Sequence, residues 1–119
     1  MNNIEKIRQA MPEYKCSAML IINPVNRLFS TGFSSSAGAL IVTEKDAYFF
    51  TDSRYIEAAK AGVNDASVEL IKGNEKITDC VNRIVKSSHI KSVGFEDDTL
   101  SYTSHNEWAA KLNIEMIPA

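Results

Sequence analysis

Apolar residues concentrate in the second quarter of the chain. Residues 39–42 and 47–50 are two continuous apolar runs rich in branched and aromatic side chains, and a short charged segment, residues 44–46, separates them. Short apolar runs joined by so brief a connection are typical of adjacent antiparallel strands. We therefore predict a strand pair near the middle of a sheet.

The residues before this pair predict one helix and one strand. Ile4, Ile7 and Met11 recur at helical spacing, and Pro12 ends the pattern, so we expect a short amphipathic helix. Residues 16–22 form an apolar run that reads as a buried strand.

The segment that links this strand to the central pair is predicted to be irregular. Pro24 removes a backbone donor and should end the strand. We expect a loop over residues 24–26, extended chain over residues 27–29, and tight turns allowed by Gly32 and by the small side chains of residues 34–38.

The second half of the chain alternates between helical and strand patterns. Residues 51–53 offer a helix N-cap cluster, and Gly62 offers a C-terminal stop. The expected elements are a helix at 54–61, a strand at 68–71, a helix carrying Ile77, Cys80, Val81 and Ile84, a strand at 92–95, a helix at 102–112 and a last strand at 114–117. Such alternation implies crossover connections. The predicted fold class is α/β, with a mixed, partly parallel sheet of about five or six strands flanked by helices.

Composition narrows the classes of function. The chain has 119 residues, enough for one domain, and a net charge of −2 with both signs scattered, which disfavours nucleic acid and membrane surfaces as partners. No apolar run approaches the roughly 20 residues that span a bilayer. We expect a cytoplasmic protein in which Cys16 and Cys80 are buried free thiols.

The sequence contains no evident catalytic motif. His89 and His105 have no second ligand at metal-binding spacing, so we interpret both as structural. The acidic residues 96–98 are read as a solvated or helix-capping turn rather than a cation site. The serines of residues 34–36 lack a Gly-x-Ser-x-Gly elbow, and the neighbouring glycines lead into a strand instead of a helix. We expect no catalytic residue and no metal ligand in this chain.

Three ordered blocks resemble the N-terminal domain of the creatinase, prolidase and Xaa-Pro aminopeptidase family. They are residues 26–33 (Asn-Arg-Leu-Phe-Ser-Thr-Gly-Phe), 36–43 (Ser-Ala-Gly-Ala-Leu-Ile-Val-Thr) and 50–55 (Phe-Thr-Asp-Ser-Arg-Tyr). Residues 93–96 and 100–102 are similar to later segments of the same family, so the resemblance covers nearly the whole chain.

The resemblance implies a two-part protein. It implies that residues 1–119 form a single creatinase-like N-terminal domain of ribonuclease H-like topology, and that the catalytic domain, of "pita-bread" shape, is a separate C-terminal unit absent from this chain. In that family, two divalent ions, commonly manganese, cobalt or zinc, are bound by the catalytic domain. The implied partners are that domain, a second copy in a homodimer, and proline-containing peptides. The isolated domain is expected to hydrolyse nothing.

The resemblance also suggests three substrate-cleft candidates: Asn26, Asp52 and Arg54. Asn26 stands where relatives often place a polar residue near the cleft, although Ser30 departs from the family pattern, which has an apolar residue there. Arg54 can meet a carboxylate. Structural alternatives remain open: Asn26 closes a turn, Asp52 caps its helix, and Arg54 pairs with Asp52 or another acid.

Two other functions are compatible with the sequence. The family includes inactive pseudo-peptidases, so the domain is alternatively a peptide- or protein-binding module. A third reading makes the chain an independent hydrolase. Phe33, Tyr55 and Trp108 are interpreted as core or interface anchors.

Overall fold

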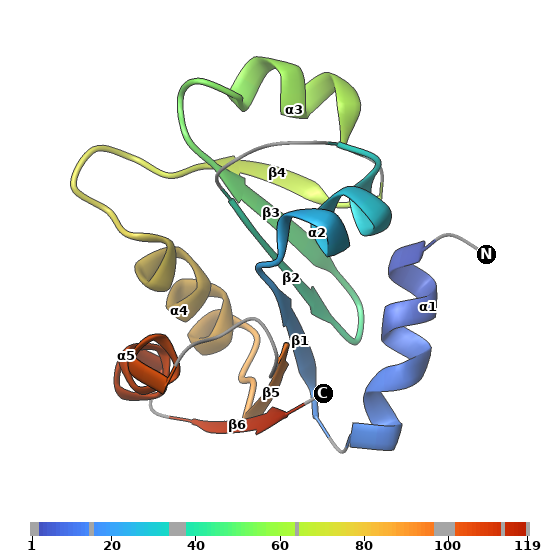
Figure 1. Cartoon of the computed structure of the whole chain (residues 1–119), viewed down its shortest axis with the longest axis vertical. Helices are drawn as coiled ribbons and strands as arrows, with labels where there is room; N and C mark the ends of the chain where they lie inside the picture. The colour runs from blue at the N-terminus through green and yellow to red at the C-terminus, as the bar shows by residue number, and fades with distance from the viewer. Residues whose placement is uncertain are drawn as a thin grey trace.

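The computed structural model describes residues 3–14, 16–33, 38–63, 65–96, 102–112 and 114–118. Figure 1 shows a central sheet with helices on both sides. In chain order, the elements are α1 (Asn3–Ala10), the 3-10 helix η1 (Met11–Tyr14), β1 (Ala18–Ile21), α2 (Pro24–Thr31), β2 (Ala39–Thr43), β3 (Ala47–Thr51), α3 (Ile56–Gly62), β4 (Ser67–Leu70), α4 (Ile77–Ser87), β5 (Ser92–Phe95), α5 (Tyr102–Leu112) and β6 (Glu115–Pro118).

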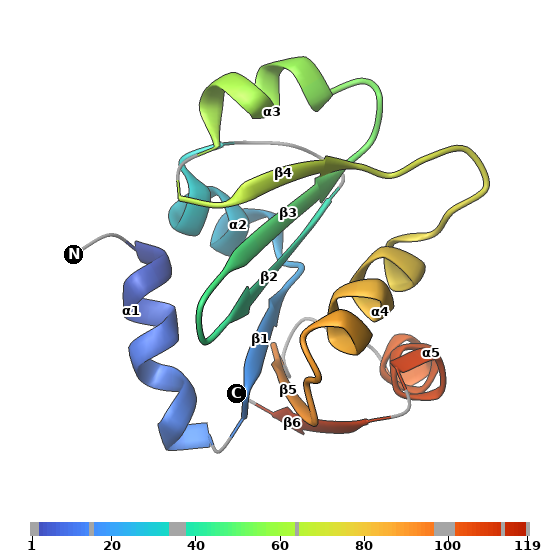
Figure 2. The same cartoon turned by 180° about the vertical axis from the view of Figure 1, so that it is seen from behind.

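The sheet has six strands in the order β4-β3-β2-β1-β5-β6 (Figure 2). Strand β2 pairs antiparallel with both β1 and β3, while the pairs β1 with β5, β3 with β4 and β5 with β6 are parallel. The mixed sheet and its central antiparallel pair are thus confirmed. The antiparallel meander β3-β2-β1 continues into parallel β5 and β6, which is the expected ribonuclease H-like arrangement.

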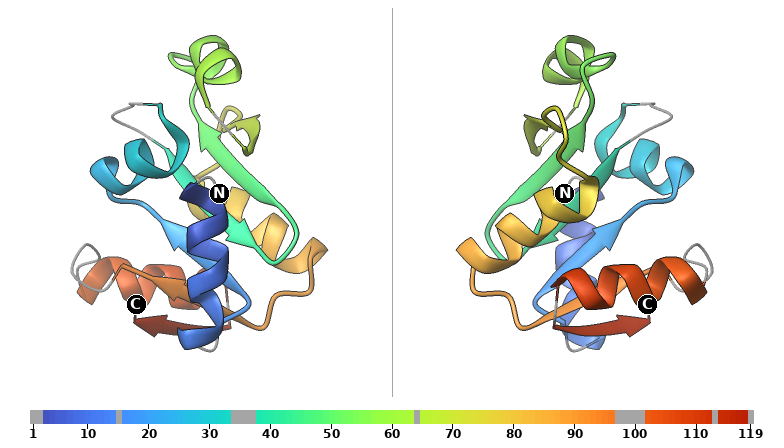
Figure 3. Two further views of the ribbon diagram at one scale, coloured as in Figure 1. Left: turned by 90° about the vertical axis from the view of Figure 1, so that its right-hand side faces the viewer. Right: turned by 90° about the vertical axis from the view of Figure 1, so that its left-hand side faces the viewer.

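Side chains alternate between two buried layers. In β1, Ala18 and Leu20 join a cluster with α4 and α5, whereas Met19 and Ile21 join a second cluster with α1 and α3. Figure 3 shows α1 in front of the sheet from one side, and α4 and α5 in front of it from the other. Helices on both faces explain why β2 is apolar from Ala39 to Val42 and buried along its whole length.

Helix α2 overturns the expectation of a loop at 24–26 and extended chain at 27–29. Asn23 Oδ1 accepts the Asn26 backbone N–H at 3.2 Å, and Asn23 O accepts the Arg27 N–H at 2.9 Å. Asn23 is therefore the N-cap, and Pro24 occupies the first helical position, where its missing donor costs nothing. The same Asn-Pro pair both ends the strand and begins a helix.

The remaining elements largely follow the sequence pattern. Strand β5 has the predicted bounds, and α4 and α5 lie where the helical spacing placed them. Cys80 is fully buried on α4, and Cys16, also buried, precedes β1. Among the described residues, none of the helices has the length and apolar character that a membrane crossing requires.

Candidate functional site

Polar side chains gather at one edge of the sheet. Strands β1, β3 and β5 run in the same direction, so the residues that follow them meet at one edge. We call this the carboxyl edge and define it by residues 22–23, 26, 52–54 and 96. In open α/β sheets, ligands bind outside the carboxyl ends of strands where neighbouring connections diverge. Here β1 leads towards β2 on one side, and β5 leads towards β6 on the other.

Glu96 connects the ends of β1 and β5. Its Oε1 accepts the backbone N–H groups of Ile22 at 2.6 Å and Asn23 at 2.9 Å, and its Oε2 accepts the side-chain amide of Asn26. Only 8% of Glu96 is exposed. The interpretation of residue 96 as part of a solvated acidic turn is therefore wrong, because this carboxylate is itself buried and accepts hydrogen bonds from the segment that follows β1. Asp97 and Asp98 lie outside the described residues.

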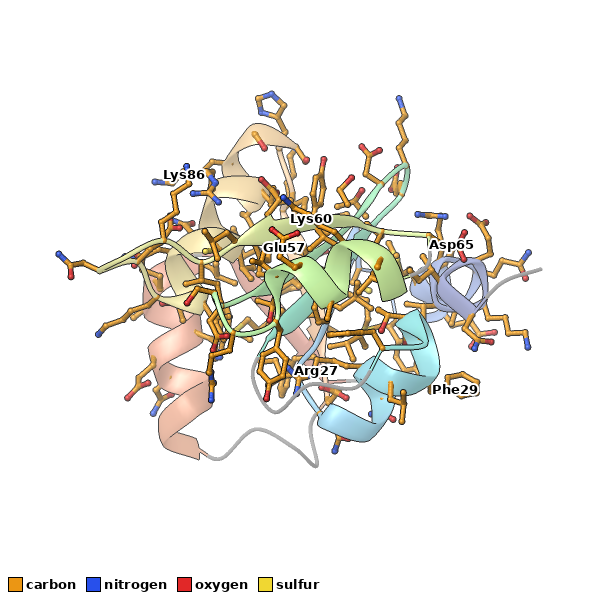
Figure 4. The ribbon with its side chains drawn as sticks, turned by 90° about the horizontal axis from the view of Figure 1, so that it is seen from above. Arg27, Phe29, Glu57, Lys60, Asp65 and Lys86 are labelled. Carbon is orange, nitrogen blue, oxygen red and sulfur yellow. The ribbon has the colours of Figure 1, made fainter. Side chains whose placement is uncertain are left out.

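Arg27 lies beneath the carboxyl edge. It is only 3% exposed, and Figure 4 shows it directed inward from α2. Its Nη1 lies 3.0 Å from the place where a Cβ on Gly38 would stand, and Gly38 has φ +147°. Burial lowers the pKa of the Arg27 guanidinium, and the charge of the Glu96 carboxylate opposes that shift. A buried cation is thus set beside the buried carboxylate that holds Asn26.

Asp52 and Arg54 form a second polar group on the same edge. Asp52 Oδ1 accepts the Arg54 backbone N–H at 3.0 Å, while Oδ2 accepts Nε at 3.1 Å and Nη2 at 2.7 Å. The hydrogen bonds from Arg54 lower the pKa of the Asp52 carboxyl. Helix α3 begins only at Ile56, so the expectation that Asp52 caps a helix starting at residue 54 is wrong. Asp52 closes a turn instead.

Arg54 remains accessible despite this ion pair. Its side chain is 65% exposed and its guanidinium lies 5.2 Å above the centre of the Tyr55 ring. The bonds to Asp52 use Nε and Nη2, so Nη1 is not engaged by Asp52. The pair and the stacking hold the side chain in place, so its remaining donors can meet an incoming anion without much ordering cost.

The structure therefore divides the three sequence candidates into two groups. Asn26 is exposed and bonded to Glu96, while Asp52 and Arg54 bond to each other. Neither the burial of Arg27 nor the hydrogen bonds of Glu96 could be identified from the sequence. The only local signal was that Glu96 is the first acid after a short apolar strand, and the sequence could not show which backbone it would meet.

Aromatic residues support this edge. Phe33 packs edge-on against Phe49, with ring centres 6.0 Å apart, and against Tyr55 at 6.5 Å. Trp108 is buried in the layer of α4 and α5. Phe29 differs, because 63% of it is exposed and it points away from α2 in Figure 4, next to Leu28 at 43%.

The structure has surface hollows, but they lie away from the carboxyl edge. Within the described ranges, no group of three or more His, Cys, Asp or Glu side chains converges. His89 is exposed in a turn with φ 54°, and the side chain of His105 lies outside the described residues. A hollow of about 630 Å³ lies between α3 and β4, and one of about 400 Å³ lies beside Ser17 and His89. Neither hollow is lined by residues of the carboxyl edge.

Known proteins are similar to this chain in sequence and in fold. Residues 3–119 match the model of the creatinase/prolidase N-terminal domain. A Bacillus subtilis peptidase described as uncharacterised, YqhT, is 31% identical over 97% of this chain and 32% of its own length. An Xaa-Pro dipeptidase from Bacillus anthracis superimposes with a TM-score of 0.92 at 32% identity, covering 98% of this chain and 32% of that one.

This chain covers most of a solved structure that consists of an N-terminal domain alone, but only a third of a longer relative. The N-terminal domain of the cytoplasmic peptidase PepQ from Mycobacterium tuberculosis H37Rv superimposes with a TM-score of 0.86 at 25% identity, over 98% of this chain and 92% of that one. By contrast, the chain spans about a third of the length of YqhT (32%). The match over residues 3–119 and the shared fold establish that this chain belongs to the creatinase/prolidase N-terminal domain family.

Proposed function

We propose that this chain is the non-catalytic N-terminal domain of a metal-dependent Xaa-Pro aminopeptidase or dipeptidase, in which it forms part of the substrate-cleft wall and contributes to assembly. The observation that carries the proposal is the superposition of 98% of the chain on a third, 32%, of the Xaa-Pro dipeptidase from Bacillus anthracis. On this proposal, residues 1–119 are one domain, and the reaction takes place on a C-terminal domain of the same protein.

The chemistry of the bond explains the use of a separate wall. An Xaa-Pro bond has no N–H, and the proline ring fixes the shape of the chain. A peptidase that recognises an extended backbone through that donor binds it poorly, so selection must come from shape and from the peptide ends. We assign the divalent ions, manganese, cobalt or zinc, to the C-terminal domain, since the described residues here offer no converging ligand set.

Asn26 and Arg54 are the proposed contacts with peptide substrates. Both are exposed at the carboxyl edge, and each is fixed by a carboxylate, Glu96 for Asn26 and Asp52 for Arg54. The guanidinium suits a peptide carboxylate, whereas the amide suits an uncharged or ammonium group. Asp52 acts through Arg54 in this proposal and does not itself contact the substrate.

The proposed assembly surface is the outer side of α2. Phe29 and Leu28 are large apolar side chains, 63% and 43% exposed, and aromatic residues are enriched in the centres of protein interfaces. We propose that they contact a second copy in a homodimer, in a cytoplasmic setting like that named for PepQ. Phe29→Ser should then shift the longer protein from dimer to monomer in sedimentation-velocity runs, and an unchanged dimer would remove this part of the proposal.

The cleft-wall role is tested by substitution in the longer protein. Asn26→Ala and Arg54→Ala should each lower kcat/KM for a Gly-Pro substrate by about 10- to 100-fold, the value of a hydrogen bond to a charged group. Asn106→Ala and Lys86→Ala, on exposed positions of α5 and α4, are matched controls. Melting temperatures are measured alongside.

The outcomes separate the rival functions. Reduced kcat/KM with unchanged melting temperature supports the cleft wall, and unchanged kinetics contradict it. A longer protein that binds proline-containing peptides but never turns them over would instead be a pseudo-peptidase binding module. Turnover by residues 1–119 alone with added manganese would make this chain the hydrolase.

A further inference from the structure

The hydrogen bonds at the carboxyl edge fix which end of the Asn26 amide faces outward. A carboxylate can only accept hydrogen bonds, so the atom that Asn26 turns towards Glu96 must be its Nδ2. Because the amide is planar, its carbonyl oxygen is then directed away from Glu96. Asn26 itself is exposed. The side chain therefore presents an acceptor to the surface, although a free asparagine can present either end.

Glu96 is held firmly enough to impose this orientation. Its other oxygen is bonded by the N–H groups of Ile22 and Asn23, at 2.6 and 2.9 Å. These donors belong to the end of β1 and the N-cap of α2, so the carboxylate is anchored to backbone on the same segment that carries Asn26. Glu96 is 8% exposed, which limits competition from water for its oxygens.

We infer that Glu96 is a positioning residue, which orients Asn26 so that its carbonyl oxygen accepts a hydrogen bond from the protonated amino terminus of a peptide substrate. This inference rests on the proposed cleft-wall function and adds the substrate group that Asn26 recognises. The reason for choosing the amino terminus is chemical. In an Xaa-Pro dipeptide the peptide bond has no N–H, so the ammonium is the backbone group that can donate to an acceptor.

The charges near Asn26 come from Glu96 and from two arginines. The Glu96 carboxylate places negative charge directly behind the Asn26 amide. The positive charge of Arg27 is turned inward at 3% exposure and interacts with Glu96, so it is not presented at the surface. Arg54, with 65% of its side chain exposed, supplies a donor for the opposite, carboxylate end of a peptide. The carboxyl edge therefore presents an exposed acceptor at Asn26 and an exposed cation at Arg54.

Glu96→Gln gives a specific test because it keeps the shape and changes one group. The glutamine carbonyl can still accept the N–H groups of Ile22 and Asn23. Its NH₂ group can only donate, so it cannot accept from Asn26, and the Asn26 amide should flip and present its own NH₂ outward. Glu115→Gln, at the start of β6 and therefore at the opposite edge of the sheet, is the matched control.

The kinetic measurement uses Gly-Pro and acetyl-proline, which is Gly-Pro without the amino group. In the longer protein, Glu96→Gln should raise KM for Gly-Pro about tenfold with little change in kcat, and leave the inhibition constant of acetyl-proline unchanged. Asn26→Leu should do the same, and Glu115→Gln should change neither. Equal weakening of both ligands would indicate general loosening of the edge and would overturn the inference.

The two levels of the proposal can fail separately. If Asn26→Leu leaves Gly-Pro kinetics unchanged, the cleft contact of Asn26 is wrong and the inference falls with it. If Asn26→Leu weakens Gly-Pro but Glu96→Gln does not, the positioning role alone is wrong. A check that does not depend on activity is the NMR signal of the Asn26 NH₂ in residues 1–119. One proton should exchange slowly in the wild-type chain, and fast exchange of both protons would contradict the bond to Glu96.

Discussion

Replacing Gly38 with alanine tests the packing beneath the carboxyl edge. Gly38 has φ +147°, a backbone conformation that side chains rarely adopt, and an added Cβ would lie 2.8 Å from the Phe50 carbonyl oxygen and 3.0 Å from Arg27 Nη1. The first neighbour is backbone within the central sheet, so it cannot move cheaply. Either Gly38 and β2 shift, or Arg27 leaves its buried position.

The expected cost follows from these two effects. Backbone strain of this kind costs about 1–3 kcal/mol, and the contact with Phe50 O adds to it, so we expect a loss of about 3 kcal/mol. For a chain of 119 residues, this lowers the melting temperature by roughly 10 °C. That is a large part of the roughly 5–15 kcal/mol that stabilises a typical domain.

Urea unfolding of residues 1–119, followed by circular dichroism, measures this loss. Gly73→Ala is the control, because Gly73 also has positive φ, +39°, but no atom lies within 4 Å of the added Cβ. It should cost about 1 kcal/mol, the strain alone. If both variants lose the same stability, the close approach of Gly38 to Phe50 and Arg27 is not what requires glycine, and the reasoning is refuted.

Two further predictions concern ionisable groups. Burial raises the pKa of Cys16, and burial with a hydrogen bond to Glu75 raises that of Cys80 to about 11. At pH 8 both thiols should therefore resist alkylation by iodoacetamide until urea unfolds the chain. Rapid labelling of the native protein would contradict their burial. Hydrogen bonds from Arg54, Cys80 and Lys111 lower the pKa values of Asp52, Glu75 and Asp79, respectively. The stability that these carboxylates contribute is therefore complete above their unfolded pKa values of about 4, and it is lost as pH falls through the lower folded pKa values. The urea concentration at the unfolding midpoint should thus decrease when the pH is lowered below about 4, and it should decrease less steeply in Asp79→Asn.

Local pattern was enough to predict most of the fold. The apolar runs of β2 and β3, the helical spacing of Cys80, Val81 and Ile84, and the short strand β5 each depend on neighbours within a few residues. Helix α2 was missed for a physical reason: Asn-Pro is equally compatible with the end of a strand and with an N-cap followed by the first helical residue. Here it does both, and the second role determines where Asn26 points.

The candidate site was harder to predict, because its bonds join distant parts of the chain. Glu96 contacts Ile22, Asn23 and Asn26 across 74, 73 and 70 residues. The sequence around an acidic run does not show whether its side chains are solvated or whether one of them is buried and bonded to the end of another strand. Asp52 and Arg54, by contrast, are two residues apart, and their pairing was among the alternatives drawn from sequence.

The central claim is that this domain guides substrates to a metal centre held elsewhere. The most direct test is to purify the longer protein with Asn26→Ala and Arg54→Ala combined, and to measure its metal content together with kcat/KM for Gly-Pro. We predict an unchanged metal stoichiometry and a kcat/KM reduced at least tenfold. Loss of metal from the variant, or unchanged kinetics at full metal content, would contradict the account.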